Sequence, residues 1–232
     1  MLSPAAMTLT GLLGGSFNPA HRAHRRISLA AADALGLDEV WWLVSPGNPL
    51  KEKAGMAPLA ARYASARRAA RRAPIRVTAI EQDLGSPYTV DTIAELVRRF
   101  PDRRFVWLMG ADNLAQFDRW RDWRRIARMV VIAVAMRPGY HGPAHRARAM
   151  GWLRRFVRPA ATARHWTTWS KPSLVLLQLP LDQTSATAIR AADPDWHRSA
   201  ERTFNPKALR DGVTRRPLDR RRHIARTDPR SA

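Results

Sequence analysis

Short apolar runs recur along the chain, and they do not alternate with polar residues. Strands of this kind are buried on both faces, as in a parallel sheet covered by helices, whereas a sheet with one wet face shows alternation. Most of these runs end at glycine, proline or a polar turn, which bounds each strand. The predicted strands are residues 8–14, 39–45, 75–80, 104–109, 129–135 and 173–179.

Amphipathic helices are predicted between these strands. Ile27, Ala31 and Leu35 recur at helical spacing, and Gly36 is a natural helix end. Strands that alternate with helices indicate an α/β fold, a doubly wound (Rossmann-like) parallel sheet with helices on both faces. Ligands of such a fold bind at the carboxyl ends of the strands. Further helices are predicted at residues 57–73, 89–100 and about 143–157.

The apolar periodicity ends after about Trp196. We therefore expect one domain over residues 7–197 and a basic, largely disordered tail over residues 198–232. The tail holds ten Arg and one Lys against four acidic residues, a net charge of +7. Met7 directly precedes the first predicted strand, so Met1 and Met7 stay open as alternative translation starts.

The composition of the 232 residues narrows the classes of function. Cysteine is absent, which excludes disulfides, thiolate metal sites and cysteine nucleophiles and favours a cytoplasmic location. No run of about eighteen apolar residues predicts a membrane span, and no signal peptide is recognisable. The 40 Lys and Arg against 19 Asp and Glu give a net charge of +21, which attracts nucleic acid, anionic lipid or phosphorylated small molecules.

The most informative segment follows the first predicted strand and reads Gly14-Gly-Ser-Phe-Asn-Pro-Ala-His21-Arg-Ala-His24. Glycines let the backbone approach an anion closely, and the start of the following helix offers unpaired N–H groups. His21 and His24 are three residues apart, so both rings are expected to project toward the same ligand. Two donors beside a phosphate site suit phosphoryl-transfer chemistry.

This segment resembles the signature of the nucleotidylyltransferases, and more narrowly that of the bacterial nicotinate-nucleotide adenylyltransferases. The resemblance implies transfer of the adenylyl group of ATP to nicotinate mononucleotide, giving nicotinate adenine dinucleotide and pyrophosphate in NAD biosynthesis. It also implies Mg²⁺ that enters with ATP, and no metal site built by the protein. Further segments match the family in the same order: Ser86-Pro-Tyr-Thr-Val-Asp-Thr92, Gly110-Ala-Asp-Asn-Leu114, Trp120, Arg137-Pro-Gly-Tyr140 and Thr184-Ser-Ala-Thr-Ala-Ile-Arg190.

The resemblance assigns residues to each substrate. His24, His21 and Arg190 are the expected catalytic residues, with His24 donating to the α-phosphate. Trp120 is expected to stack on the pyridine ring, and Thr89 is expected to receive the nicotinate carboxylate. The expected ATP- and phosphate-binding residues are Gly14, Gly15, Ser16, Phe17, Lys51, Ser185 and Thr187. The expected nicotinate mononucleotide-binding residues are Tyr88, Thr89, Gly110, Asp112, Trp120 and Arg137.

Alternatives remain for the acceptor and for the class of protein. Within the fold, nicotinamide mononucleotide or phosphopantetheine are alternative acceptors, although phosphopantetheine enzymes usually have threonine at the position of His21. From another class, the net charge of +21 permits a basic nucleic-acid-binding protein. No aromatic platform or reading helix accompanies the basic residues, so nucleic acid is expected to bind only nonspecifically, through the tail. Ala23 and Ala186 replace a glycine and a serine of the family, which predicts an effect on rate rather than on reaction type.

Overall fold

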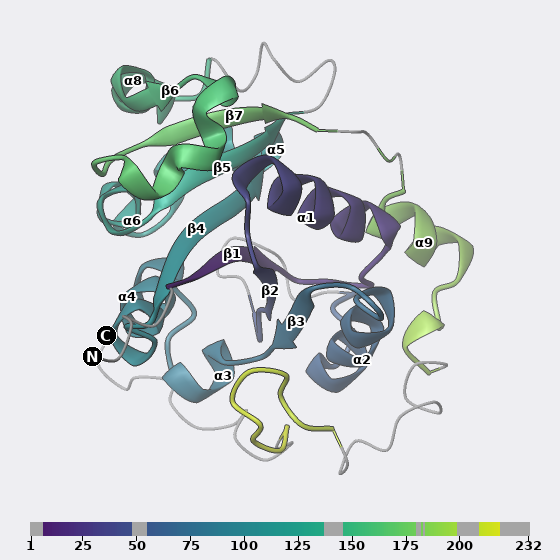
Figure 1. Cartoon of the computed structure of the whole chain (residues 1–232). Helices are drawn as coiled ribbons and strands as arrows, with labels where there is room; N and C mark the ends of the chain where they lie inside the picture. The colour runs from purple at the N-terminus through teal and green to yellow at the C-terminus, as the bar shows by residue number, and fades with distance from the viewer. Residues whose placement is uncertain are drawn as a thin grey trace, which may run out of the picture.

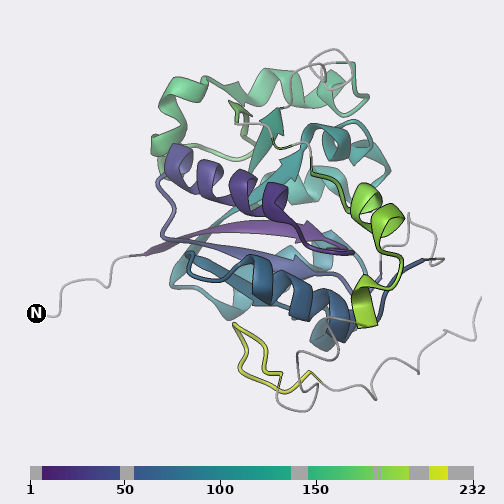
Figure 2. The same cartoon turned by 90° about the vertical axis from the view of Figure 1, so that its right-hand side faces the viewer.

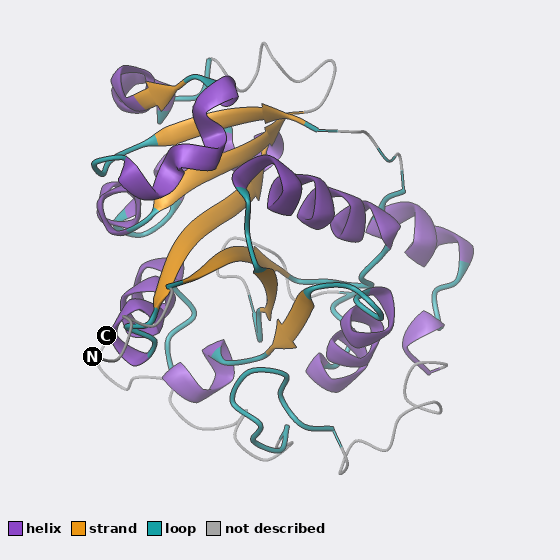
Figure 3. Cartoon of the chain, in the orientation of Figure 1, coloured by secondary structure: helices purple, strands orange, loops and turns teal. Residues whose placement is uncertain are grey.

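The computed structural model describes residues 7–47, 55–136, 146–179, 182, 184–198 and 209–218. This part of the chain forms one parallel sheet with the strand order β3-β2-β1-β4-β5-β7-β6 (Figures 1 and 3). The doubly wound α/β fold expected from the sequence is thereby confirmed. The strands are β1 (Thr8–Gly15), β2 (Glu39–Val44), β3 (Ile75–Thr78), β4 (Arg103–Gly110), β5 (Val131–Met136), β6 (Val157–Arg158) and β7 (Leu174–Gln178).

Helices connect these strands and cover both faces of the sheet. The α-helices are α1 (Arg22–Leu35), α2 (Leu59–Ala69), α3 (Glu81–Leu84), α4 (Thr89–Arg99), α5 (Ala111–Leu114), α6 (Trp123–Met129), α8 (Met150–Leu153) and α9 (Ala186–Ala192). The 3-10 helices are η1 (Phe117–Arg119), η2 (Arg154–Phe156) and η3 (Ala160–Thr168). None of the helices in the described ranges is long and apolar enough to cross a membrane.

Two apolar cores lie on opposite faces of the sheet. One core packs α1, α2 and η3 against the strands, and the other packs α4, α6 and α8 against them. Trp41 and Trp42 are neighbours on β2 and belong to different cores, and each is at most 1% exposed. Successive residues of a strand point to opposite faces, so burial on both faces explains why the strands are apolar without alternation.

The strand order reverses between β1 and β4. The chain runs outward from β1 through β2 to β3, and then returns to β4 on the other side of β1. In an open parallel sheet, the crevice at the carboxyl ends of the two strands where the order reverses is the usual ligand site. The segment after β1 therefore lies where the sequence predicted a ligand.

Several predicted boundaries differ from the structure. The strand expected at residues 129–135 begins at Val131, because α6 continues through Met129. The strand expected at residues 75–80 ends at Thr78. The basic helix expected near residues 143–157 is wrong for the described part, which holds only α8 and η2 before β6 begins. Gly151 weakens a long helix there, and one turn already buries Met150 and Leu153.

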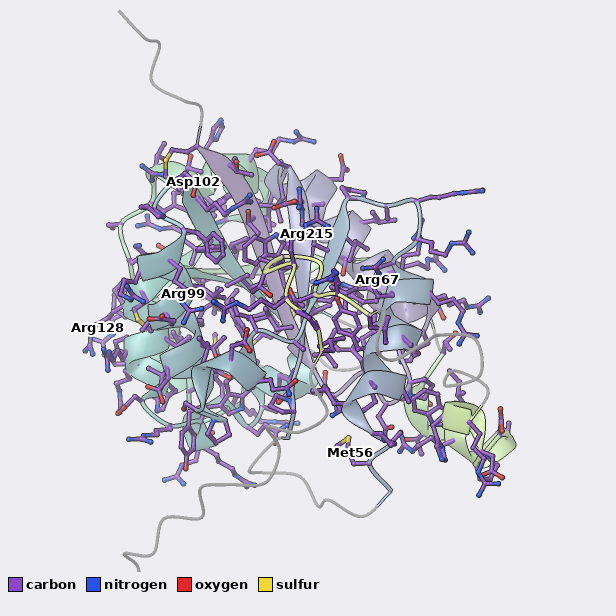
Figure 4. All side chains as sticks on the ribbon, turned by 90° about the horizontal axis from the view of Figure 1, so that it is seen from below. Met56, Arg67, Arg99, Asp102, Arg128 and Arg215 are labelled. Atoms are coloured by element: carbon purple, nitrogen blue, oxygen red, sulfur yellow. The ribbon has the colours of Figure 1, made fainter. Side chains whose placement is uncertain are left out.

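Residues 209–218 differ from the expectation of an unpacked tail. They lie beside β3 (yellow in Figures 1 and 2), with Leu209 and Asp211 at most 6% exposed. The Gly212 N–H donates to the Val77 carbonyl at 3.0 Å, and a Cβ on Gly212 would lie 2.5 Å from that oxygen. Figure 4 labels Arg215 on this segment and Arg67 on the neighbouring α2. The expected domain boundary near residue 197 stays a prediction.

Asp211 attaches this segment to the turn that follows β3. Its Oδ2 accepts from the Ala79 N–H at 2.7 Å and from the Thr78 hydroxyl at 3.0 Å. Its Oδ1 accepts from the backbone N–H groups of Val213 and Thr214. These bonds join a buried carboxylate to three backbone donors and one hydroxyl. A hydrophobic pattern does not reveal contacts of this kind, so periodicity could not predict this packing.

We expect Asp211→Ala to lower the free energy of unfolding by about 2–4 kcal/mol, because buried donors lose a charged acceptor. For a chain of this length, each 1 kcal/mol corresponds to roughly 2–4 °C in Tm. Thermal unfolding measures the shift. Asp195→Ala is the matched control, since Asp195 is an exposed partner of Arg198 and such pairs contribute about 0–1 kcal/mol. Equal Tm values for the two variants would contradict the structural role of Asp211.

Candidate active site

A cavity of about 320 Å³ opens beside the carboxyl ends of β1 and β2 and borders β4. One side of the cavity is the glycine segment, and the other side is formed by the start of α4 and the segment after η1. The sequence motifs before α1 and before α4 therefore meet at one place. The lining residues are Gly14, Gly15, Ser16, Ser45, Glu81, Pro87, Tyr88, Thr89, Trp107, Asn113, Arg119, Trp120 and Arg121.

The glycine segment is shaped by close packing. A Cβ on Gly14 would lie 2.7 Å from the ring of Trp107, so only glycine fits at this position. Phe17 adopts the left-handed region at φ 48°, and its buried ring stacks on Trp42 at 5.0 Å. Gly14, Gly15 and Ser16 are thereby held at the cavity.

The two histidines lie side by side at the start of α1. His21 is the N-cap residue, His24 is the third helical residue, and their ring centroids are 3.9 Å apart. The His21 backbone N–H donates to His24 Nδ1 at 3.3 Å. In a neutral ring, a nitrogen that accepts a hydrogen bond leaves the proton on the other nitrogen. This contact therefore favours the tautomer in which His24 Nε2 carries the proton, as a donor to a phosphate requires.

Arg190 connects the segment Thr184–Arg190 to the segment Gly14–His24. Its guanidinium donates to the Asn18 carbonyl at 2.6 Å and to the Thr187 hydroxyl at 3.3 Å. Ser185 is the N-cap of α9, and its hydroxyl accepts from the Ala188 N–H at 3.1 Å. Arg190 and Thr187 thus lie next to the loop that leads to His21, and their role in binding the triphosphate stays a prediction.

A charged contact holds the entry of α9 against α1. Asp182 accepts from Thr184 and pairs with Arg22 at 3.0 Å and with Arg26 at 3.6 Å. The Thr184 hydrogen bonds and the Arg22 contact keep the pKa of Asp182 well below its usual value. Figure 2 shows α9 beside the N-terminal end of α1. The pairing helps to fix α9, which carries Arg190.

Aromatic and polar side chains form the opposite wall of the cavity. Trp120 packs edge-on against Trp107 with ring centroids 6.1 Å apart, and it remains half-buried. Tyr88 is the N-cap residue of α4, and Thr89 is the first residue of that helix. The Arg121 guanidinium lies 4.6 Å from the centre of the Tyr88 ring. A flat ring beside hydroxyl and cationic groups suits an aromatic ligand that carries a carboxylate.

Eight expected site residues in the described ranges are not among those that line this cavity: Phe17, His21, His24, Gly110, Asp112, Ser185, Thr187 and Arg190. Gly110 and Asp112 lie at the end of β4 and do not line it, and Asp112 is exposed with its carboxylate close to Gly110. Lys51 and Arg137 lie outside the described residues. The substituted Ala23 is 2% exposed and belongs to the protein interior rather than to the cavity lining.

The role of Arg62 in α2 was not predicted from the sequence. This residue is 1% exposed, and its guanidinium donates to the carbonyls of Ser16 and Ser45 at 2.7 Å each and to that of Ala57 at 2.9 Å. Burial lowers the pKa of Arg62 to about 10, so it stays charged at neutral pH. Arg62 thus ties the loops after β1 and β2 together beneath the cavity. In the sequence it is one of many arginines, and no local pattern separates it from exposed ones.

Glu81, Trp107, Arg119 and Arg121 are further lining residues that the motifs did not reveal. Burial raises the pKa of Glu81 to about 7, and the nearby hydroxyls of Ser45 and Thr92 oppose this shift. Among the described residues, no group of three or more His, Asp or Glu side chains could hold a metal ion. The cavity offers hydrogen-bond donors, cations and aromatic surface rather than a carboxylate cage.

Comparison with known proteins defines the class. The cytidylyltransferase-like family model matches residues 12–192, which include the glycine segment, the two histidines and Arg190. Two solved structures of the nicotinic acid mononucleotide adenylyltransferase of Plasmodium falciparum share the fold. The structure complexed with APC has a TM-score of 0.59 and 14% identity, covering 79% of this chain and 83% of that one. The structure complexed with NaAD has a TM-score of 0.58 and 15% identity, with the same coverage. This class is that of the cytidylyltransferase-like nucleotidyltransferases.

Curated relatives define the family more narrowly. The probable nicotinate-nucleotide adenylyltransferase of Erythrobacter litoralis (strain HTCC2594) is 59% identical over 214 residues, covering 92% of this chain and 96% of the relative. That of Parvibaculum lavamentivorans (strain DS-1 / DSM 13023 / NCIMB 13966) is 51% identical over 180 residues, covering 78% of this chain and 90% of the relative. The chain belongs to the nicotinate-nucleotide adenylyltransferase family.

Proposed function

We propose that this enzyme transfers the adenylyl group of ATP to the phosphate of nicotinate mononucleotide at the cavity described above. The products are nicotinate adenine dinucleotide and pyrophosphate, in NAD biosynthesis. The observation that most supports this proposal is that Gly14–Ser16 and the Tyr88–Thr89–Trp120 wall line one cavity. Phosphate-binding and pyridine-binding chemistry are thus adjacent, as joining two nucleotides requires.

The reaction needs alignment more than proton transfer. The acceptor phosphate is ionised at neutral pH, so its oxygen attacks the α-phosphorus without a general base. The P–O bond to the β-phosphate breaks, and pyrophosphate leaves with the bonding electrons. Catalysis therefore consists of in-line positioning and stabilisation of the charge on the phosphates. His24 Nε2–H is the proposed donor to the α-phosphate, and His21 and Arg190 hold the triphosphate.

Backbone and hydroxyl groups complete the phosphate site. Gly15, Ser16 and Phe17 would offer donors to substrate phosphates, as the loop before a helix commonly does. Ser185 and Thr187 would bind the triphosphate from the side of α9, and Lys51 is proposed to contact phosphate as well. Mg²⁺ is proposed to enter with ATP, bound to phosphate oxygens whose charge it reduces.

The pyridine ring is proposed to stack on Trp120 beside Tyr88. The Thr89 hydroxyl and nearby backbone N–H groups would receive the carboxylate, with Arg137 contributing positive charge. Neither Gly110 nor Asp112 lines the cavity, so their proposed role in binding nicotinate mononucleotide has less structural support. Asp112 would contact a ribose or order the loop rather than contact the carboxylate. We also propose that the enzyme works in the cytoplasm, which the absence of cysteine favours.

The test is pyrophosphate release with ATP and Mg²⁺ and one acceptor at a time. We expect saturable turnover with nicotinate mononucleotide and a much lower kcat/KM with nicotinamide mononucleotide and with phosphopantetheine. Preference for either of the other acceptors would reassign the substrate. DNA retention that falls steeply with salt, without turnover on any acceptor, would favour the nucleic-acid-binding alternative.

Thr89→Val should reduce the preference for the acid over the amide. Valine keeps the shape but removes the hydroxyl donor, and a hydrogen bond to a charged group contributes roughly 1.5–3 kcal/mol, so the ratio should fall about tenfold or more. Saturation curves with both mononucleotides measure this ratio. Trp120→Ala is the comparison variant, and it should weaken both mononucleotides about equally while sparing the KM for ATP. An unchanged ratio in Thr89→Val would place carboxylate recognition elsewhere.

A further inference from the structure

Two buried polar atoms at the cavity have no hydrogen-bond partner among the described residues. Glu81 Oε2 and Trp107 Nε1 are both unpaired, although their residues are 6% and 2% exposed. Both residues line the same cavity. An unpaired buried polar group costs about 1–3 kcal/mol, so a partner that arrives with a ligand would recover that cost. Each atom therefore lacks a partner that a ligand group at this cavity can supply.

The position of Glu81 is well fixed. Its Oε1 accepts from the Thr92 hydroxyl at 3.4 Å, and Asp211 holds the Ala79 N–H two residues earlier. The Trp107 ring is fixed by contact with Gly14 and with Trp120. The fixed positions mean that neither side chain readily turns away to find another partner.

The charges around the cavity indicate which group approaches Glu81. Arg119 and Arg121 line the cavity with Trp120, so the nicotinate carboxylate is attracted toward that side. An indole N–H can only donate, whereas a carboxylate accepts. A hydroxyl group accepts from the first and donates to the second. A carboxylate ligand would satisfy the indole but would be repelled by an ionised Glu81.

We propose that Glu81 and Trp107 bind a ribose hydroxyl of the mononucleotide, with Trp107 Nε1–H donating to the hydroxyl and the hydroxyl donating to Glu81. This inference rests on the proposed function for the identity of the ligand. Glu81 and Trp107 would then select acceptors that carry a ribose, whether the pyridine substituent is an acid or an amide. The burial that raises the pKa of Glu81 to about 7 is the burial that a hydroxyl donor would offset.

The test is equilibrium binding without catalysis, by titration calorimetry of the full chain. The probes are nicotinate mononucleotide, its 2′-deoxy and 3′-deoxy analogues, nicotinamide mononucleotide and a non-hydrolysable ATP analogue. In the wild type, one deoxy analogue should bind roughly ten- to hundredfold more weakly than nicotinate mononucleotide. Glu81→Leu and Trp107→Phe, which keep apolar volume, should reduce that discrimination to about twofold or less. Glu81→Gln, which keeps an acceptor, should retain part of it.

Other binding results would overturn the proposal or reassign the two residues. Equal binding of all three nicotinate ligands by the wild type would overturn the proposal. A change in the acid-to-amide ratio in Glu81→Leu would overturn it too, because Glu81 would then face the pyridine substituent. Weakened binding of the ATP analogue with mononucleotide binding unchanged would assign the pair to the ribose of ATP instead. Failure of adenylyl transfer with these binding differences intact would count against the proposed function alone.

Discussion

His24→Ala is expected to lower kcat by a hundredfold or more. Loss of one preorganised donor to developing phosphate charge costs about 3 kcal/mol of transition-state stabilisation. The Kd for ATP should change much less, because the glycine segment and Arg190, which we also propose to bind the triphosphate, are unchanged. Steady-state kinetics and calorimetry measure the two quantities separately.

Two comparison variants separate catalysis from packing at this position. His24 also contacts Phe17 and Trp42, so alanine removes some packing. His24→Gln keeps an N–H donor and should recover part of the lost kcat. His165→Ala, at an exposed histidine of η3, should leave kcat unchanged. Turnover of His24→Ala within threefold of the wild type would remove His24 from the catalytic assignment.

Arg62→Leu is expected to lower the free energy of unfolding by about 3 kcal/mol or more, since each hydrogen bond from a charged group contributes roughly 1.5–3 kcal/mol. The carbonyls of Ser16 and Ser45 lose their shared donor, so the loop that we propose to hold phosphate should shift and the KM for ATP should rise. Tm and the KM for ATP measure the two effects. Arg62→Lys should recover only part of either, because an ammonium lacks the guanidinium fork.

Arg68→Leu is the matched control on the same helix. Arg68 is exposed, so its replacement should change the free energy of unfolding by less than about 0.5 kcal/mol. An Arg62→Leu variant as stable as Arg68→Leu, with an unchanged KM for ATP, would contradict the bracing role of Arg62.

The sheet and its helices were largely predictable from the sequence, because burial on both faces leaves a local trace. Trp41, Trp42 and their neighbours form an apolar run, and Gly36 ends α1 in the left-handed region at φ 63°. Boundaries were less predictable where the chain changes from strand to helix without a turn signal. Thr78 ends β3 and Glu81 begins α3, and tertiary contacts rather than local sequence decide that change.

Candidate site residues were predictable where they belong to a recognisable motif, and not where they stand alone in the sequence. The segment Gly14–His24 and the pair Tyr88–Thr89 have recognisable spacing, and the fold brings Gly14–Ser16 and Tyr88–Thr89 to one cavity. Arg62 and Glu81 are single charged residues in ordinary surroundings, and only the folded structure buries them. Asp211 was missed for the same reason. Its contacts are hydrogen bonds to a distant strand end, which no periodicity encodes.

The most direct test follows the α-phosphorus of ATP. The full chain is incubated with Mg²⁺, nicotinate mononucleotide and ATP labelled at the α-phosphorus, and the products are separated and counted. The account predicts label in nicotinate adenine dinucleotide, with one unlabelled pyrophosphate released per dinucleotide formed. Label in free AMP without dinucleotide, or in pyrophosphate, would contradict adenylyl transfer to the mononucleotide.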